Sequence, residues 1–125
     1  MNSKLQEVLP VIEKRLGQPD IESFKIGKSN DSRQRFLEYE DPLHFLGIIA
    51  RGNADTINKA ECDLIAHFQE CVKCTNKNAG GGGNENATEL YIVAKKHYEH
   101  PLKNKEQLEH LLEPSYLFDF ETINI

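Results

Sequence analysis

The sequence predicts an α+β domain in which a small, mainly antiparallel β-sheet is flanked by helices. Two observations support this. First, three short segments rich in β-branched and aromatic residues are bounded by turn residues, at positions 24–27, 43–50 and 88–96. Second, apolar residues recur at helical spacing before and between these segments. At 125 residues the chain is long enough to bury one core, so we expect a single domain over residues 1–125.

Helical patterns are expected at residues 3–16, 32–39, from Asp55 or Thr56 to about 70, and 103–112. Pro10 lies inside the first pattern, so that helix is expected to start or kink there. Residues 43–50 are almost continuously apolar, which is typical of a strand covered on both faces. The four glycines at 80–83 exclude regular structure. The aromatic tail at 116–120 is expected to pack back on the domain or on a second copy.

The charge balance argues against bulk attraction to nucleic acid. The formal net charge is −5. The acid excess lies in residues 53–125, whereas residues 22–52 carry equal numbers of basic and acidic side chains. A protein that grips DNA without sequence preference depends on excess positive charge. Any contact with nucleic acid would therefore use a local basic face, and the region around Arg35 is the candidate.

The chain carries no sign of a membrane or secretory destination. Its N-terminus lacks the apolar core of a signal peptide, and no apolar run approaches membrane-spanning length. Three cysteines, an odd number, lie close together, which favours reduced thiols over a disulfide framework. We therefore expect an intracellular protein, cytoplasmic or nuclear, with no membrane partner.

The segment 24–39 has the pattern of a strand, a turn at Gly27 and a helix. Asp31, like the asparagine before it, is a good N-cap for that helix. A helix N-terminus presents unpaired N–H groups that suit an anion, and Lys28, Arg33 and Arg35 lie beside it in sequence. The pattern therefore indicates a phosphate-binding corner. A corner whose charges are merely solvated is the alternative.

Glu61 falls within the apolar stripe of the helix that follows residue 55. The stripe consists of Ile57, Ala60, Leu64, Ile65 and Phe68. A carboxylate in such a stripe is costly unless it has a charged partner, binds a metal or reaches a cleft. The alternative is a carboxylate at the edge of the stripe with its head in solvent.

A zinc site is a competing possibility. Cys71 and Cys74 have the CxxC spacing of zinc ligands, and Cys62 and His67 lie nearby in sequence. Cys62 and His67 are five residues apart, which is a poor match to one helix face, and a second ligand pair is missing. Unpaired thiols are therefore the default.

Taken in order, these residues resemble the GIY-YIG nuclease superfamily. Lys25-Ile26-Gly27 stands where that family has Tyr-Ile-Gly. Arg35 stands at the place of the catalytic Arg, and Tyr39, one turn later, at the place of a His or Tyr. Glu61 matches the metal-binding Glu, and Asn76 matches the structural Asn beside a glycine-rich loop. The resemblance covers residues 24–83 and implies a GIY-YIG-like domain with an added N-terminal helix and a C-terminal strand, helix and tail.

The resemblance implies an endonuclease that hydrolyses phosphodiester bonds of nucleic acid, with DNA as the expected partner. Glu61 would hold Mg²⁺ or Mn²⁺ through oxygen. Arg35 would clamp the phosphate, with Arg33 and Lys28 holding the neighbouring backbone. Tyr39 or Tyr91 would orient or deprotonate the attacking water.

Two departures from the family pattern leave an alternative open. The first hairpin strand, Gly-Ile-Tyr, is absent before residue 24, and Lys25 replaces the tyrosine of Tyr-Ile-Gly. In the family these tyrosines line the site. The strand that contains Tyr91 would have to fill the vacant place in the sheet from the C-terminal side. The alternative is a catalytically inactive module of the same fold that binds nucleic acid or protein.

Overall fold

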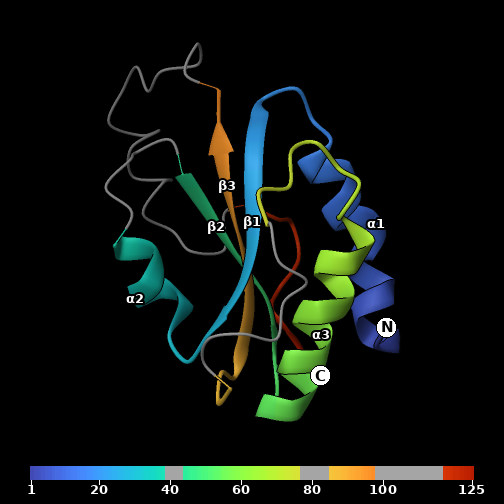
Figure 1. The fold of residues 1–125 in the computed structure, drawn as a ribbon, viewed down its shortest axis with the longest axis vertical. Helices are drawn as coiled ribbons and strands as arrows, with labels where there is room; N and C mark the ends of the chain where they lie inside the picture. The colour runs from blue at the N-terminus through green and yellow to red at the C-terminus, as the bar shows by residue number, and fades with distance from the viewer. Residues whose placement is uncertain (39–43, 77–84, 98–116) are drawn as a thin grey trace.

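The computed structural model describes residues 1–38, 44–76, 85–97 and 117–125. It has the α+β class that the sequence predicts, with a sheet between helices (Figure 1). The elements follow the order α1 (Ser3–Leu16), β1 (Ile21–Ser29), α2 (Ser32–Leu37), β2 (His44–Arg51), α3 (Ala54–His67), β3 (Glu89–Lys96) and β4 (Ile123–Asn124). The expected helix at 103–112, the glycines at 80–83 and Tyr39 lie outside the described residues.

β3 lies at the centre of the sheet, although it comes late in the chain. It pairs antiparallel with β1 on one side and with β2 on the other. The short β4 then pairs parallel with β2, which gives the order β1-β3-β2-β4. The three long strands are therefore antiparallel as expected, whereas the whole sheet is mixed because the C-terminal residues return beside β2.

The sheet separates two layers of helix. Figure 1 shows α1 and α3 on one face and α2 on the other. Successive side chains of a strand point to opposite faces. Alternate residues of β1 and β3 accordingly join a large core with α1 and α3, to which Phe24, Ile26 and Ile92 belong. A smaller core on the α2 face contains Phe36, Leu46, Tyr91 and Val93.

The helices differ from the expected boundaries at several ends. α1 begins at Ser3, capped by Asn2, and runs through Pro10, which neither starts nor ends it. The cap of α3 is Asn53, whose side chain accepts from the backbone N–H of Thr56, so the expected caps Asp55 and Thr56 are wrong by two or three residues. α3 ends at His67 rather than near residue 70, and α2 ends at Leu37.

β1 is longer than expected, because Gly27 lies within the strand and not in a turn. The strand runs from Ile21 to Ser29, and Gly27 pairs with Tyr91 of β3. The chain turns only after Ser29, where Asp31 caps α2 by accepting from the backbone N–H of Gln34. The predicted turn at Gly27 is therefore wrong, whereas the predicted cap Asp31 is confirmed.

Asp20 joins α1 to the start of the sheet. Its carboxylate accepts from Arg15 at 3.1 and 3.3 Å and lies 3.5 Å from the ammonium of Lys96. Burial raises the pKa of Asp20, but the hydrogen bonds and charge of Arg15, together with Lys96, outweigh it and lower the pKa below 3.8.

The C-terminal tail packs back on the domain, as expected. Leu117 and Phe118 are buried, and a Cβ at Gly47 would lie 2.4 Å from the Phe118 ring. Only a residue without a side chain lets the tail approach β2 so closely. Phe118 and Phe120 stack on one another with ring centroids 5.3 Å apart. Within the described part of the chain, none of the helices has the length and apolar content to cross a membrane.

Candidate functional site

Three consecutive residues of β1, Ile26 to Lys28, contact three of the residues that the sequence predicts to be functional. Ile26 contacts Asn76, Gly27 contacts Tyr91, and Lys28 contacts Glu61. These partners come from the segment after α3, from β3 and from α3 itself. We call Gly27, Lys28, Glu61, Asn76 and Tyr91 the β1 cluster.

Lys28 and Glu61 form a buried ion pair between β1 and α3. The ammonium lies 3.6 Å from Oε1 of Glu61, and the two side chains are 2% and 9% exposed. Lys28 also donates to the side-chain oxygen of Asn58, one turn before Glu61 on α3. Asn58 in turn donates to the backbone carbonyl of Glu85. The Glu61 carboxylate within the apolar stripe is therefore compensated by a buried cation, which is what such burial requires.

Gly27 is required by the close approach of Tyr91. A Cβ at Gly27 would lie 2.5 Å from both Cζ and the hydroxyl oxygen of Tyr91. Such a contact is impossible without a shift of the ring or the backbone. The Tyr91 ring therefore lies across Gly27 on the α2 face, and its hydroxyl is held beside the backbone of β1. The ring itself is buried with Phe36 and Leu46.

Asn76 fastens the segment after α3 to the outer edge of β1. Its side-chain oxygen accepts from the N–H of Ile26, and its amide nitrogen donates to the Ile26 carbonyl, both at 2.8 Å. The two bonds replace those that a neighbouring strand would make. The adjacent backbone continues the pattern, because Phe24 donates to Lys73 and accepts from Thr75, both at 2.9 Å.

The predicted anion site at the N-terminus of α2 is wrong, because the chain itself fills it. The backbone N–H of Ser32 donates to Oε1 of Glu89 at 2.8 Å. The second oxygen of Glu89 accepts from Arg51 at 2.7 Å. A carboxylate is favoured at a helix N-terminus for the same reason as a phosphate. Glu89, the first residue of β3, thus takes the place expected for an external anion.

The arginines of α2 lie apart from the Lys28–Glu61 pair. Arg35 is 58% exposed and forms a surface ion pair with Glu38 at 3.4 Å. Lys28 instead turns to α3 on the opposite face of the sheet, so the described structure does not bring it together with Arg33 and Arg35. The strand continues through Lys28, and its alternation directs that side chain away from α2.

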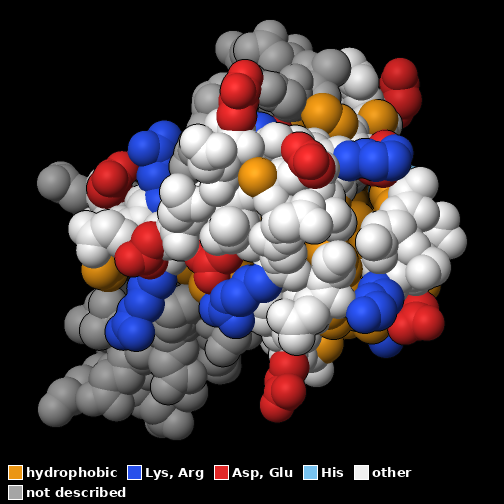
Figure 2. All heavy atoms as spheres, turned by 90° about the horizontal axis from the view of Figure 1, so that it is seen from below, with side chains coloured by type: hydrophobic (Ala, Val, Ile, Leu, Met, Phe, Trp, Pro, Cys, Tyr) orange, Lys and Arg blue, Asp and Glu red, His pale blue; other side chains and the backbone are white. Residues whose placement is uncertain are grey.

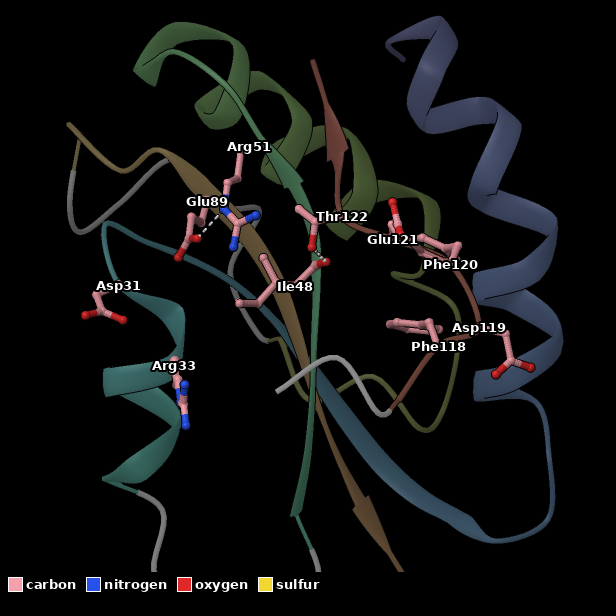
Figure 3. Close-up of a pocket in the computed structure, with 10 residues that line it drawn as sticks. All are labelled: Asp31, Arg33, Ile48, Arg51, Glu89, Phe118, Asp119, Phe120, Glu121 and Thr122. Carbon is pink, nitrogen blue, oxygen red and sulfur yellow. Dashed lines mark hydrogen bonds and ion pairs between the residues drawn. The ribbon is translucent and has the colours of Figure 1, made fainter. Parts of the chain in front are cut away.

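Arg33 lines an open pocket between α2, the sheet and the C-terminal tail (Figure 3). The pocket has a volume of about 790 Å³. Its walls combine the Arg51–Glu89 ion pair with Phe118 and Phe120, and the hydroxyl of Thr122 donates to the Ile48 carbonyl beneath it. Charges of both signs line this pocket, so it has no preference for an anion by charge alone.

The competing zinc set is not assembled in the described structure. Cys62, Cys71 and Cys74 are free thiols, and His67 contacts Glu13 at 2.8 Å. Among the residues that the structure describes, no three His, Cys, Asp or Glu side chains gather into a group that could hold a metal ion. With the described residues alone, a metal at Glu61 would thus need water and substrate oxygens to complete its ligands.

Sequence reasoning missed Asn58, Glu89 and Arg51. Asn58 precedes Glu61 by three residues, so helical spacing places both on one face, and this signal was available. Glu89 and Arg51 are 38 residues apart, and only the sheet register brings them together.

Comparison with known proteins adds no relative. No family model, curated protein or solved structure matches this chain. The assignment of a function therefore rests on the geometry of the β1 cluster and on the surface around it. On the face shown in Figure 2, Lys and Arg side chains are interspersed with Asp and Glu, so that face has no field of a single sign.

Proposed function

We propose that this chain is a GIY-YIG-like endonuclease that hydrolyses nucleic-acid phosphodiester bonds, DNA being the expected substrate, with a divalent metal ion. The observation that carries the proposal is the β1 cluster. Residues 26 to 28 of one strand hold Asn76, Tyr91 and Glu61, which come from three other parts of the chain. These residues, which resemble a catalytic motif in sequence, all contact β1, with Glu61 on the α3 face of the sheet, Tyr91 on the α2 face and Asn76 at the outer edge.

The position of β3 supports the proposal in a second way. The GIY-YIG pattern lacks its first strand here, and β3 lies directly beside β1, with Tyr91 opposite Gly27. Tyr91 is therefore the candidate for the missing tyrosine, supplied by a strand that follows the other motif residues in the chain rather than preceding them. In our proposal the chain is a rearranged member of the superfamily.

Glu61 is the residue that would hold the metal ion. Mg²⁺ keeps several waters and is commonly bound by one or two carboxylates together with substrate phosphates, so one carboxylate meets the minimum donor set. When bound, the ion would stabilise the negative charge that develops on the phosphate and the leaving oxygen. Lys28 fixes one oxygen of the Glu61 carboxylate.

The remaining roles fall to Arg35 and Tyr91. Within the described part of the chain, Arg35 forms an exposed ion pair with Glu38, which is a weak constraint, so its guanidinium can turn to clamp a phosphate with two hydrogen bonds. The Tyr91 hydroxyl beside Gly27 would orient or deprotonate water. Tyr39 shares that role as an alternative, and Arg33 would contact the neighbouring backbone.

A specific observation favours a second candidate function, an inactive module that binds nucleic acid or protein. The charge of Glu61 is already balanced by Lys28, so its burial has a structural explanation without a metal. Lys25 also replaces the tyrosine that the family uses. In this case Glu61 would stabilise the fold and Arg35 would contribute to binding alone.

Nicking of supercoiled plasmid tests the proposal. Wild type should nick in Mg²⁺ or Mn²⁺ and stop with a chelator. Arg35→Ala should slow nicking by about two to three orders of magnitude, because it removes a clamp on the developing charge. Glu61→Gln should abolish it and spare binding, and circular dichroism must show that this variant is folded, because it breaks a buried ion pair. Asp55→Asn, an exposed carboxylate change on the same helix, is the matched control and should nick like wild type.

Binding at low salt separates the two candidates, because electrostatic attraction to phosphates is strongest there. If wild type binds labelled DNA but never nicks it, with either metal and varied substrates, the binding module is correct. If wild type neither binds nor cleaves DNA or RNA, both nucleic-acid functions are excluded and a protein-interaction role replaces them.

A further inference from the structure

A tight turn carries Cys71 and Cys74 at the outer edge of β1. The backbone N–H of Cys74 donates to the Cys71 carbonyl at 3.1 Å, which closes the turn. The residue after Cys71, Val72, is 98% exposed, so the tip of the turn projects into solvent. The two thiols are half-buried and free. A small reagent can therefore reach the turn from solvent while its base stays fixed to the domain.

From this geometry we propose that Cys71 and Cys74 form a reversible modification site, in which small disulfides of the glutathione class convert the two thiols into an intramolecular disulfide. A turn closed between residues i and i+3 keeps their Cα atoms within about 7 Å. Disulfides join cysteines whose Cα atoms are roughly 4.4–6.8 Å apart. The turn therefore brings the two cysteines into bonding range without movement of the sheet.

The reaction is two successive thiol–disulfide exchanges. The Cys71 thiolate attacks one sulfur of the reagent, forms a mixed disulfide and releases one reagent thiol. The Cys74 thiol then loses its proton and attacks the Cys71 sulfur, which releases the second reagent thiol and leaves the Cys71–Cys74 bond. Two electrons pass from the protein to the reagent. Burial raises the pKa of the Cys74 thiol, and the neighbouring Cys71 adds to this, so Cys74 suits the second, resolving step.

The turn should stay docked in both redox states. Its bonds to β1 run through the backbone of Lys73 and Thr75 and do not involve sulfur. One contact does change: the Cys74 thiol donates to the side-chain oxygen of Asn76 at 3.5 Å, and a disulfide has no proton to donate. Oxidation therefore removes one bond to the residue that fastens Ile26. This site is independent of the proposed nuclease activity.

Peptide mapping tests the proposal. Trypsin cleaves after Lys73, between the two cysteines, so Cys71 and Cys74 fall into separate peptides, 60–73 and 74–77, unless a disulfide joins them. The full chain is equilibrated with graded ratios of oxidised to reduced glutathione, alkylated and digested without reductant. Peptide 60–73 also contains Cys62, so the Cys62→Ser variant is treated in parallel to assign the bond.

In oxidised glutathione the wild type should lose two of its three alkylatable thiols and yield the joined peptides. Cys62→Ser should yield the same joined peptides, and reductant should restore both thiols. Cys71→Ser and Cys74→Ser should each yield only a mixed disulfide with glutathione. Joined peptides that vanish in Cys62→Ser, or wild type that stops at mixed disulfides at every ratio, would overturn the proposal.

Discussion

The Lys28–Glu61 pair gives the sharpest prediction about stability. Glu61→Gln leaves the Lys28 ammonium, 2% exposed, beside a neutral amide, and Lys28→Met leaves a buried carboxylate without its cation. Removal of one partner of a buried ion pair typically costs about 3–5 kcal/mol, because the remaining charge is uncompensated. Replacing both partners avoids that penalty. The double variant should therefore be much more stable than the sum of the two single changes predicts.

Urea denaturation followed by circular dichroism measures this double-mutant cycle. For a domain of this size the free energy of unfolding falls by about 1–3 kcal/mol per molar urea, so a loss of about 3–5 kcal/mol should lower the midpoint of each single variant by about 1–5 M. The double variant should recover most of that loss. Lys59→Ala, which removes an exposed lysine paired with Asp63 on the same helix, is the matched control and should shift the midpoint little.

Small, additive stability losses would contradict a buried Lys28–Glu61 pair. If each single variant cost less than about 0.5 kcal/mol, as exposed residues do, and the double variant equalled their sum, Lys28 and Glu61 would not be a buried pair. A large cost for Glu61→Gln alone, with none for Lys28→Met, would mean that another residue compensates the carboxylate.

Three further predictions concern the surroundings of β1. Gly27→Ala should lower the free energy of unfolding, measured by thermal denaturation, by about 1–3 kcal/mol, because the added methyl group meets the Tyr91 ring. Tyr91→Leu in the same chain should reduce that loss. An unchanged stability of Gly27→Ala would contradict the close approach. Asn76→Ala should lower the free energy of unfolding by about 1–3 kcal/mol and speed hydrogen exchange at the Ile26 amide. Unchanged exchange at that amide would exclude the hydrogen bond from Ile26 to Asn76. The pKa of Asp20 is lower in the folded state than its unfolded value of 3.8, so the ionised carboxylate stabilises the fold above pH 3.8. Asp20→Asn should therefore be less stable than wild type at pH 7, and the difference in stability should shrink as the pH falls below 3.8. A stability difference that does not change with pH would contradict this prediction.

Local patterns were sufficient to place β2, β3 and the apolar stripe of α3, whereas β1 extends beyond the predicted strand and β4 was not predicted. The runs at 43–50 and 88–96 fall within one residue of β2 and β3, because β-branched and apolar residues favour covered strands whatever their partners. The sequence placed Glu61 within the helical stripe but left open whether its carboxylate is buried or reaches solvent, and the structure buries it. The sequence did not show whether a charged partner, a metal or a cleft compensates its charge, because Lys28 lies on another element.

The errors arose where a distant residue determines a local structure. Glycine is typical of turns, so the sequence favoured a turn at Gly27, whereas this glycine makes room for the Tyr91 ring that lies across the strand. The N-terminus of α2 has the local pattern of an anion site, yet Glu89 occupies it from 57 residues away. The direction of Lys28 likewise depends on how far β1 continues. Each of these follows from sheet register, which no window of a few residues contains.

The central claim is that Glu61 binds metal and does more than balance Lys28. Titration of Mn²⁺ into wild type, Glu61→Gln and the control Asp55→Asn by isothermal calorimetry tests it most directly, with circular dichroism to verify that each variant is folded. Metal binding at Glu61 predicts one binding event in wild type and Asp55→Asn, and its loss in Glu61→Gln. Identical isotherms for wild type and folded Glu61→Gln would contradict it and leave Glu61 as the structural partner of Lys28.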